Sequence, residues 1–280
     1  MKNRKWLAGV ILTAVIALVL LGAVLAAWLY EANGNLTLEK IAYDRSKKNP
    51  VVYIKENDEY VPYIVLTSDY DGNVLLLREN VLPEEMQYQP SPHGEAMGAL
   101  SAPWAWYDYG SYYEESSIDE FLNTEFPKVF SDAVQTAIVD TTIEVTDMAS
   151  YDEEQWAEAT HTIERKVFLL SAVELGVKFG VGYTMAEEGR PLKYFKNADN
   201  SVKKAYKADG KAWPYWTRTP HIWETCEVTA IGVDYETITA TADSRLGVRP
   251  AFCLGKDTVV QKSDSGIEGK SVYILELDDG

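Results

Sequence analysis

The first apolar segment of the chain is a long uninterrupted run near its N-terminus. From Trp6 to Tyr30 no side chain is charged, and Thr13 is the only small polar one. As a helix this run would be about 37 Å long, at about 1.5 Å per residue, against a hydrocarbon core of about 30 Å. Tryptophan and tyrosine at its ends favour the headgroup layer. The pattern predicts a transmembrane helix over residues 6–30.

The charges around this run predict its orientation. Lys2, Arg4 and Lys5 precede it, so the positive-inside rule places residues 1–5 in the cytoplasm. We therefore expect a single-pass plasma-membrane protein that contacts the membrane through residues 6–30, with all later residues outside the cell. A cleaved signal peptide is the alternative, although its apolar region is usually only about 7–15 residues long.

The residues after the apolar run divide into a stalk and one large domain. Residues 31–50 are polar and predict a short stalk, and residues 51–280 predict an extracellular domain. Runs of β-branched and aromatic residues begin this domain and predict strands at 51–54, 60–66 and 74–77. Asp71-Gly72 separates the last two runs, so we expect them to form a hairpin.

Two serine-led signals predict helices further along. Ser117-x-x-Glu120 and Ser171-x-x-Glu174 both fit the capping box, in which the serine hydroxyl and the glutamate carboxylate bind free backbone amides. The second follows an apolar run, residues 167–170, that predicts a buried strand, and its helix is expected to reach about Phe179. Residues 80–116 show no period and are rich in proline and aromatic residues, which predicts a long loop.

The last third of the chain predicts strands again. Residues 227–233 and 236–242 flank Asp234-Tyr235 and predict a second hairpin, with further strands expected at 248–254 and 272–277.

Composition excludes several classes of protein. The chain has 26 basic and 43 acidic residues and a net charge of −17, so nucleic acid, which binds through Lys and Arg, is not an expected partner. Two cysteines exclude a disulfide-dense scaffold and a four-cysteine zinc site. The three histidines, at 93, 161 and 221, form no metal-binding couplet, and we expect neither a metal nor another cofactor.

Four motifs occur in a distinctive order. They are SIDEFLNTEF with the following VF (117–130), KVFLLSAVE (166–174), YWTRTP (215–220) and GVRPAFCL (247–254). Together they resemble an uncharacterised bacterial domain family that is common in surface proteins of gut Firmicutes, in which the last two motifs read WWLRSP and GVRPA. The resemblance covers about residues 55–255, and Thr217 and Thr219 are conservative departures from it.

That family looks related to the C-type-lectin-like fold in its formylglycine-generating-enzyme version. The resemblance implies an α+β domain with small twisted antiparallel sheets, two flanking helices and long aromatic loops. The expected fold class is this C-type-lectin-like mixed fold, preceded by one transmembrane helix. Within it we expect structural roles for Trp216, Arg218, Gly247, Arg249 and Pro250. Function does not follow from fold.

A cluster of aromatic side chains is the predicted binding site. Trp213, Tyr215, His221 and Trp223 lie within eleven positions of one another, and Tyr235 follows at the expected hairpin turn. Flat rings stack on sugars and cations, and tryptophan and tyrosine are frequent in binding hot spots. The alternative is that these rings fill the core.

Cys226 and Cys253 leave two structural alternatives open, a disulfide or two buried thiols. The resemblance to formylglycine-generating enzymes implies a third, a copper-binding pair that oxidises a substrate cysteine, but both cysteines lie in expected core strands.

The sequence carries no nucleophile elbow, phosphate loop or dinucleotide fingerprint, and we expect a protein without enzymatic activity. The predicted function is a membrane-anchored extracellular adhesion or receptor domain that recognises a glycan or a protein surface. The alternatives are a variable receptor diversified by a retroelement and a surface enzyme, either an oxidase of the formylglycine-generating type or a glycosidase.

Overall fold

The chain divides into two units, Met1–Leu36 and Thr37–Gly280. The computed structural model describes residues 36–46, 51–90, 111–147, 159–177, 187–196, 200–221, 226–267, 270–275 and 277. Every helix and strand among these residues belongs to the second unit.

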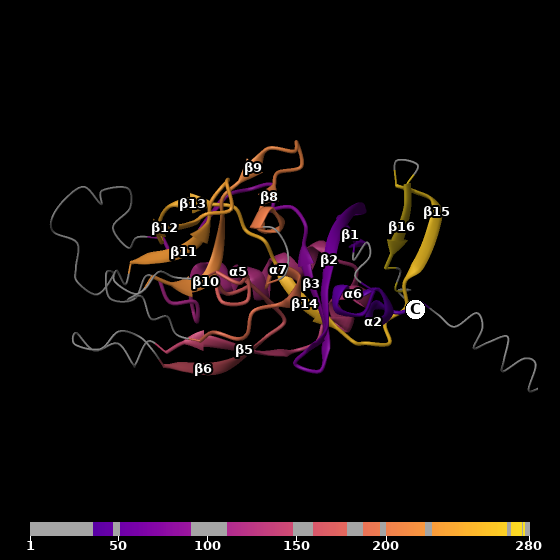
Figure 1. The fold of residues 1–280 in the computed structure, drawn as a ribbon, viewed down its shortest axis with the longest axis horizontal. Helices are drawn as coiled ribbons and strands as arrows, with labels where there is room; N and C mark the ends of the chain where they lie inside the picture. Colours follow the sequence, from indigo (N-terminus) through magenta and orange to yellow (C-terminus); the bar gives the residue numbers. More distant parts are fainter. Residues whose placement is uncertain are drawn as a thin grey trace, which may run out of the picture. The chain divides into compact units, whose positions relative to one another are not determined.

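A seven-stranded sheet forms the centre of this unit, in the order β15-β16-β1-β2-β3-β14-β7 (Figure 1). Its neighbours are antiparallel, except that β16 pairs in parallel with β1. The strands are β1 (Val51–Glu56), β2 (Glu59–Tyr70), β3 (Asn73–Arg78), β7 (Val167–Phe168), β14 (Ala251–Leu254), β15 (Gln261–Ile267) and β16 (Lys270–Ile274).

The hydrophobic core lies on the central strands of this sheet. All four residues of β14 and five of the six in β3 are buried, which is the continuous apolar pattern of strands covered on both faces. An aromatic cluster on one of these faces joins the sheet to the segment that contains α5 (Ser117–Thr124), η1 (Phe126–Val129) and α6 (Asp132–Ala137). Phe130 contacts Tyr63 of β2, Phe252 of β14 and Phe126 of η1.

Smaller sheets surround the central one. A three-stranded sheet has the order β10-β11-β12, and three further pairs are β4 with β13, β5 with β6, and β8 with β9. These strands are β4 (Met86–Gln87), β5 (Thr141–Thr146), β6 (Thr160–Arg165), β8 (Ala205–Tyr206), β9 (Ala212–Trp213), β10 (Tyr215–Pro220), β11 (Glu227–Ile231), β12 (Thr237–Thr241) and β13 (Arg245–Leu246).

Both predicted hairpins are confirmed. β2 and β3 pair across Asp71-Gly72, where both residues have positive φ, and β11 and β12 pair across a turn that contains Tyr235. Turn residues are a local signal, which is why the sequence locates these two features well.

The expected α+β class agrees roughly with the structure, but the expected arrangement of its sheets does not. Strands make up 43% and helices 18% of the described residues, so β-sheet dominates. One large mixed sheet stands where small antiparallel sheets were expected, because β16 returns to pair in parallel with β1. Apolar runs predict strands, but they do not predict which strands become neighbours.

The expectation of a transmembrane helix is also corrected. Within the described part of the chain, no helix is long and apolar enough to cross a membrane. The predicted segment, residues 6–30, and the cytoplasmic residues 1–5 lie outside the described residues. An apolar run shows only that a spanning helix would be long enough. The structure therefore gives no support to a preceding transmembrane helix or to a single-pass plasma-membrane localisation.

Part of the expected stalk belongs to the folded body. Residues 37–46 form α2 (Leu38–Ile41) and α3 (Tyr43–Ser46), both of which pack on β2. Leu38 and Ala42 are fully buried, so the body begins near Thr37 rather than at residue 51.

Two further short helices are α7 (Lys193–Lys196) and η3 (Asn200–Lys203).

The two serine-led signals differ from expectation in detail. Ser116, not Ser117, caps α5 and accepts a hydrogen bond from the Asp119 amide. At the second signal, Ser171 and Glu174 exchange both capping-box hydrogen bonds, but the residues after them form turns rather than a helix.

Candidate functional site

The predicted aromatic site does not form one exposed surface. Trp213 is half-buried on β9, with the Lys207 ammonium 3.6 Å and the Lys211 ammonium 4.9 Å from its ring centroid. Lys207 is itself held by Glu85, with its Nζ 2.7 Å from Oε1. The indole ring is therefore occupied by cations of its own chain, which leaves less of it for a ligand.

The other members of the predicted site are separated from Trp213 by burial or position. Tyr215 is 3% exposed and donates its hydroxyl to the Lys203 carbonyl at 2.8 Å, so it cannot stack on a ligand. His221 follows the opposite end of β10, with its Nδ1 3.8 Å from a Glu227 oxygen. Tyr235 is 41% exposed at the hairpin turn, and Trp223 lies outside the described residues.

The residues expected to be structural are buried in the core. Trp216 is 1% exposed and donates its indole N–H to the Met86 carbonyl, while Arg249 donates to the carbonyl of Arg78, whose own amide donates to the carbonyl of Pro250. Gly247 lies so close to the Pro214 carbonyl that a side chain there would begin 2.9 Å from its oxygen.

Arg218, the arginine of the YWTRTP motif, is the centre of a buried ionic network. It is fully buried and pairs with the fully buried Glu174, with Nη1 2.7 Å from Oε2 and Nη2 3.0 Å from Oε1. It also donates to the carbonyls of Leu169 and Glu144. Burial alone would lower the pKa of Arg218, but the attraction of Glu174 outweighs it and the pKa is raised.

Glu188 forms the second acidic member of this network. It is fully buried and accepts hydrogen bonds from the Thr146 amide, the Thr146 hydroxyl and the Thr219 hydroxyl. Burial raises the pKa of this carboxyl above its ordinary value, although Arg218 opposes the shift. Two motifs noted in the sequence, FLLSAVE and YWTRTP, thus meet in one network whose evident role is to hold the fold together.

The two cysteines are thiols and not a disulfide. Cys226 precedes β11 in the three-stranded sheet, and Cys253 lies in β14 of the central sheet. Burial raises the pKa of the Cys253 thiol to about 12. At neutral pH it therefore stays protonated, which is unfavourable for a metal ligand or a nucleophile.

A polar pocket opens above the buried network. Its volume is about 830 Å³, and its wall comes from α3, the turn between β2 and β3, β5, β6 and the segment that leads into α7. Tyr70 and Glu174 connect it to the network, because the Tyr70 hydroxyl donates to Glu174 at 2.5 Å and the Tyr70 ring stacks on Phe168. The lining residues are Asp44, Arg45, Thr67, Asp69, Tyr70, Asp71, Thr142, Glu144, Thr162, Glu174, Gly189, Arg190, Pro191, Leu192 and Lys193.

Backbone amides fix two of the carboxylates on the pocket wall, Asp71 and Glu144. Asp71 accepts from the Thr142 amide at 2.8 Å, and Glu144 accepts from the Gly189 amide at 2.7 Å. Each of these two uses one oxygen, and its other oxygen accepts no hydrogen bond from the residues that the structure describes. Asp71 and Glu144 therefore each have a fixed position and one oxygen left as an acceptor.

Two cationic side chains line the same pocket as these acceptors. Arg190 and Lys193 line the same pocket and form no ion pair with any described residue. Among the described ranges, no group of three histidine, cysteine or acidic residues is arranged to hold a metal ion. The wall thus combines fixed acceptors with charged donors, an arrangement suited to hydrogen bonding.

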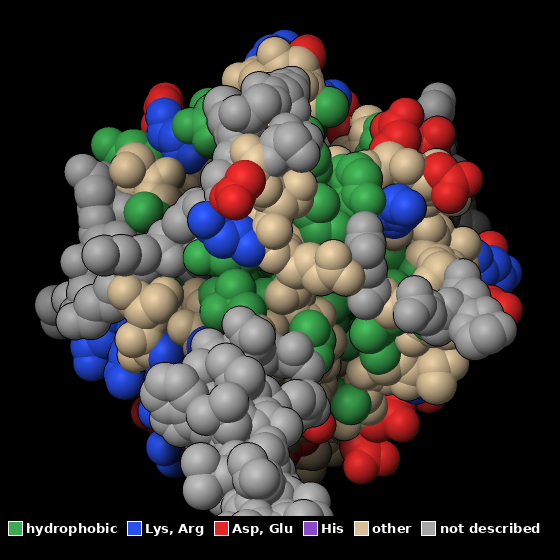
Figure 2. Space-filling model, turned by 90° about the vertical axis from the view of Figure 1, so that its right-hand side faces the viewer, with side chains coloured by type: hydrophobic (Ala, Val, Ile, Leu, Met, Phe, Trp, Pro, Cys, Tyr) green, Lys and Arg blue, Asp and Glu red, His purple; other side chains and the backbone are tan. Residues whose placement is uncertain are grey.

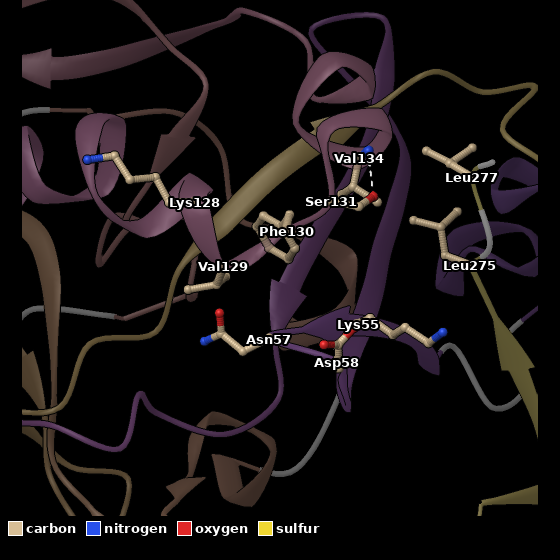
Figure 3. Close-up of a pocket in the computed structure, with 10 residues that line it drawn as sticks. All are labelled: Lys55, Asn57, Asp58, Lys128, Val129, Phe130, Ser131, Val134, Leu275 and Leu277. Atoms are coloured by element: carbon tan, nitrogen blue, oxygen red, sulfur yellow. Dashed lines mark hydrogen bonds between the residues drawn. The ribbon is translucent and has the colours of Figure 1, made fainter. Parts of the chain in front are cut away.

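A second hollow, of about 610 Å³, lies between the β1–β2 turn, the segment that joins η1 to α6, and the C-terminal end of the described chain. Figure 3 shows Phe130 between Asn57 and Asp58 on one side and two leucines on the other, while the Lys55 and Lys128 side chains extend in opposite directions. In Figure 2, hydrophobic side chains gather near the middle of the end of the domain that lies on the right in Figure 1. Half of its ten lining residues are polar, but the two lysine side chains point apart, and we assign it no site.

The polar pocket was not foreseen from the sequence. Its residues come from several separate segments, and no single motif contains them. Asp71 belongs to the turn dipeptide Asp71-Gly72 and Asp69 shortly precedes it, so both look like ordinary turn residues. Only the approach of β5 and Gly189 places them beside other polar groups.

The fold and the site define the class of protein: it is a β-rich domain in which a buried ionic network lies under a polar pocket. Residues 71–256 match the model of a family described as a domain of unknown function, DUF6273. The match covers more than half of the chain, and the chain belongs to this family. It does not extend to a lectin-like relationship or to a Firmicutes origin. No curated protein and no solved structure matches the chain.

Proposed function

We propose that this chain is a non-catalytic binding domain whose polar pocket takes a neutral, hydroxyl-rich glycan. The observation that carries the proposal is the pair of wall carboxylates, Asp71 and Glu144, each fixed by a backbone amide and each left with one oxygen to accept. Sugar hydroxyls donate to such oxygens and accept from Arg190 and Lys193. Hydrogen bonds to charged groups contribute about 1.5–3 kcal/mol each. Glycan binding at this pocket needs no relationship to C-type lectins.

The alternatives receive less support. Diversification by a retroelement requires variable side chains at an exposed surface, whereas all six residues of β10 and all four of β14 are buried. An oxidase of the formylglycine-generating type requires reactive cysteines, and burial holds the pKa of Cys253 at about 12. A glycosidase requires a proton donor beside the substrate, and Glu188, whose pKa burial raises, is fully buried below the pocket.

The experiment is a glycan array probed with the full chain, followed by calorimetric titration of the best neutral oligosaccharide. We expect Asp71→Asn and Glu144→Gln each to weaken binding at least about tenfold, which corresponds to 1.4 kcal/mol. Glu120→Gln is the matched control, because Glu120 is exposed on α5 outside the pocket. Equal affinity of both pocket variants and the wild type would exclude this pocket as the binding site.

A further inference from the structure

Edge strands in this domain differ in how they are protected. An edge strand presents unpaired backbone groups, and proteins usually shield them with shortness, bulges, proline or lysine. At the edges of the central sheet, β7 has two residues, and β15 carries Lys262 and an irregular register with β16. In the three-stranded sheet, β10 is buried throughout and ends at Pro220. β12, the other edge of that sheet, has none of these features.

β12 is a regular, exposed edge. It reads Thr-Ile-Thr-Ala-Thr over Thr237–Thr241 and pairs with β11 in an unbroken register. Thr237 and Thr239 are exposed, and the other three residues of the strand are half-buried. In Figure 1, β12 follows β11 on the side away from β10.

The alternation of hydrogen-bonded pairs between β11 and β12 shows which residues of β12 point their backbone N–H and C=O groups away from β11. The Gly232 amide donates to the Glu236 carbonyl, and the Ala242 amide donates to the Cys226 carbonyl. Hydrogen-bonded pairs alternate along an antiparallel ladder, so Ile238 and Ala240 also bond to β11. The backbone groups of Thr237, Thr239 and Thr241 then point away from β11. Among the described residues, the only bond to them is a local one, from the Ser244 amide to the Thr241 carbonyl.

The strand is complementary to a second copy of itself. If two β12 strands pair antiparallel about Thr239, the outward-facing Thr237 meets Thr241 of the copy, so all three outward positions fall in hydrogen-bonded pairs. On the opposite face, Ile238 meets Ala240 of the copy, which places a large side chain against a small one. Cross-strand pairs of this kind are the unit of sheet stabilisation.

The proposed pairing is confined to β12 itself. Asp234 lies in the turn before the strand, and Arg245 lies beyond the turn that follows it, in β13, where it pairs with Gln87 of β4. An isologous contact of this kind is closed by its two-fold axis and does not propagate.

We infer that β12 is a homodimerisation edge, through which two copies of this chain join their three-stranded sheets into one continuous sheet. The contact is weak at low ionic strength, because each copy carries a net charge of −17. Salt strengthens it between about 0.1 M and about 1 M, where the Debye length falls from about 10 Å to about 3 Å. The inference is independent of the glycan proposal, because β12 contributes no residue to the polar pocket.

Sedimentation equilibrium of the full chain over a range of concentration and salt tests this inference. Thr239→Pro removes the central outward N–H and leaves the ladder with β11 intact, since proline is tolerated at an edge position whose N–H faces solvent. We expect its dimer dissociation constant to rise at least about tenfold. Thr239→Val is the matched control: it keeps the backbone groups and the branched side chain, and its dimer should match the wild type within about twofold.

A second variant distinguishes loss of the dimer from misfolding of the proline variant. Thr239→Lys keeps the strand backbone and places two lysines opposite each other, so it should also abolish the dimer while circular dichroism stays unchanged. A concentration-dependent dimer that both disruptive variants lose would support the inference. A wild-type chain that stays monomeric at high salt, or a dimer that survives both variants, would overturn it, as would a monomer that pairs β12 with an extended peptide instead.

Discussion

Glu174 and Glu188 are fully buried at and below the polar pocket, whereas Asp71 and Glu144 are exposed on its wall, and the two pairs use the same chemical group differently. Both oxygens of each buried carboxylate accept hydrogen bonds from the protein. Each wall carboxylate spends one oxygen on a backbone amide. The difference indicates that donors on the protein, not the residue type, decide whether an acidic side chain stabilises the fold or remains available to a ligand.

The largest expected effect comes from breaking the buried ion pair. Arg218→Met leaves the Glu174 carboxylate buried with only the Tyr70 and Ser171 donors. We expect a loss of about 3–5 kcal/mol of unfolding free energy, the usual cost of an uncompensated buried charge. Urea unfolding monitored by circular dichroism measures it.

The double variant Arg218→Met, Glu174→Met provides the control. It removes both charges and should recover part of the loss, because neither buried charge is then left alone. A single variant that lost less than about 1 kcal/mol would show that the network does not hold the core together.

Gly189→Ala should have the next largest effect. Gly189 has a φ of +88°, and a Cβ atom there would begin 2.8 Å from Oε1 of Glu174. Left-handed backbone is unfavourable for other residues, and the new methyl would push Glu174 away from Arg218. We expect a loss of about 1–3 kcal/mol in the same unfolding assay. The Gly210→Ala variant separates the two causes: its φ is +81° but a Cβ there meets nothing within 4 Å, so it should cost less.

The buried network also shows how far the sequence can predict this molecule. The turn dipeptide at Asp71 located its hairpin because the signal is local. Ser171-x-x-Glu174 predicted a helix cap, and both capping hydrogen bonds exist. No helix follows, and Glu174 also binds Tyr70 and Arg218, which are 104 and 44 residues away. Such distant partners leave no local pattern.

The candidate site was harder to predict for the same reason. A binding site was predicted around Trp213 because several aromatic residues are close together in the sequence there. In the structure Tyr215 is buried and the ring of Trp213 is covered by lysines. The pocket wall brings together Asp71, Glu144 and Arg190 from segments with no common motif. Residues that are close in the sequence therefore do not form one exposed surface here. The residues that are close in space, around the pocket, share no sequence pattern that could have identified them.

Glu188 predicts a smaller effect that depends on pH. Because burial raises its pKa in the folded state, the folded protein holds this proton more tightly than the unfolded chain does. Its contribution to stability is full below the unfolded value, about 4.3, and is lost as pH rises through the folded value. Glu188→Gln cannot titrate, so the wild type should lose stability relative to this variant as the pH rises above about 4.3. A difference that stays constant with pH would show that folding does not raise the pKa of this carboxyl.

Asp71→Asn should have the smallest effect on stability. This variant tests the contrast between the buried carboxylates and the wall carboxylates. Asp71 is exposed and has a φ of 46°, a conformation that asparagine adopts readily, and Asn-Gly is a favoured dipeptide in two-residue hairpins. The amide oxygen of asparagine can still accept from the Thr142 amide. We expect the unfolding free energy to change by no more than about 0.5 kcal/mol, in the same urea assay that detects the loss at Arg218. Because the fold is then intact, any loss of glycan affinity in this variant belongs to the pocket itself. A loss of stability as large as that of Arg218→Met would instead make Asp71 a structural residue and remove the distinction between the two carboxylate pairs.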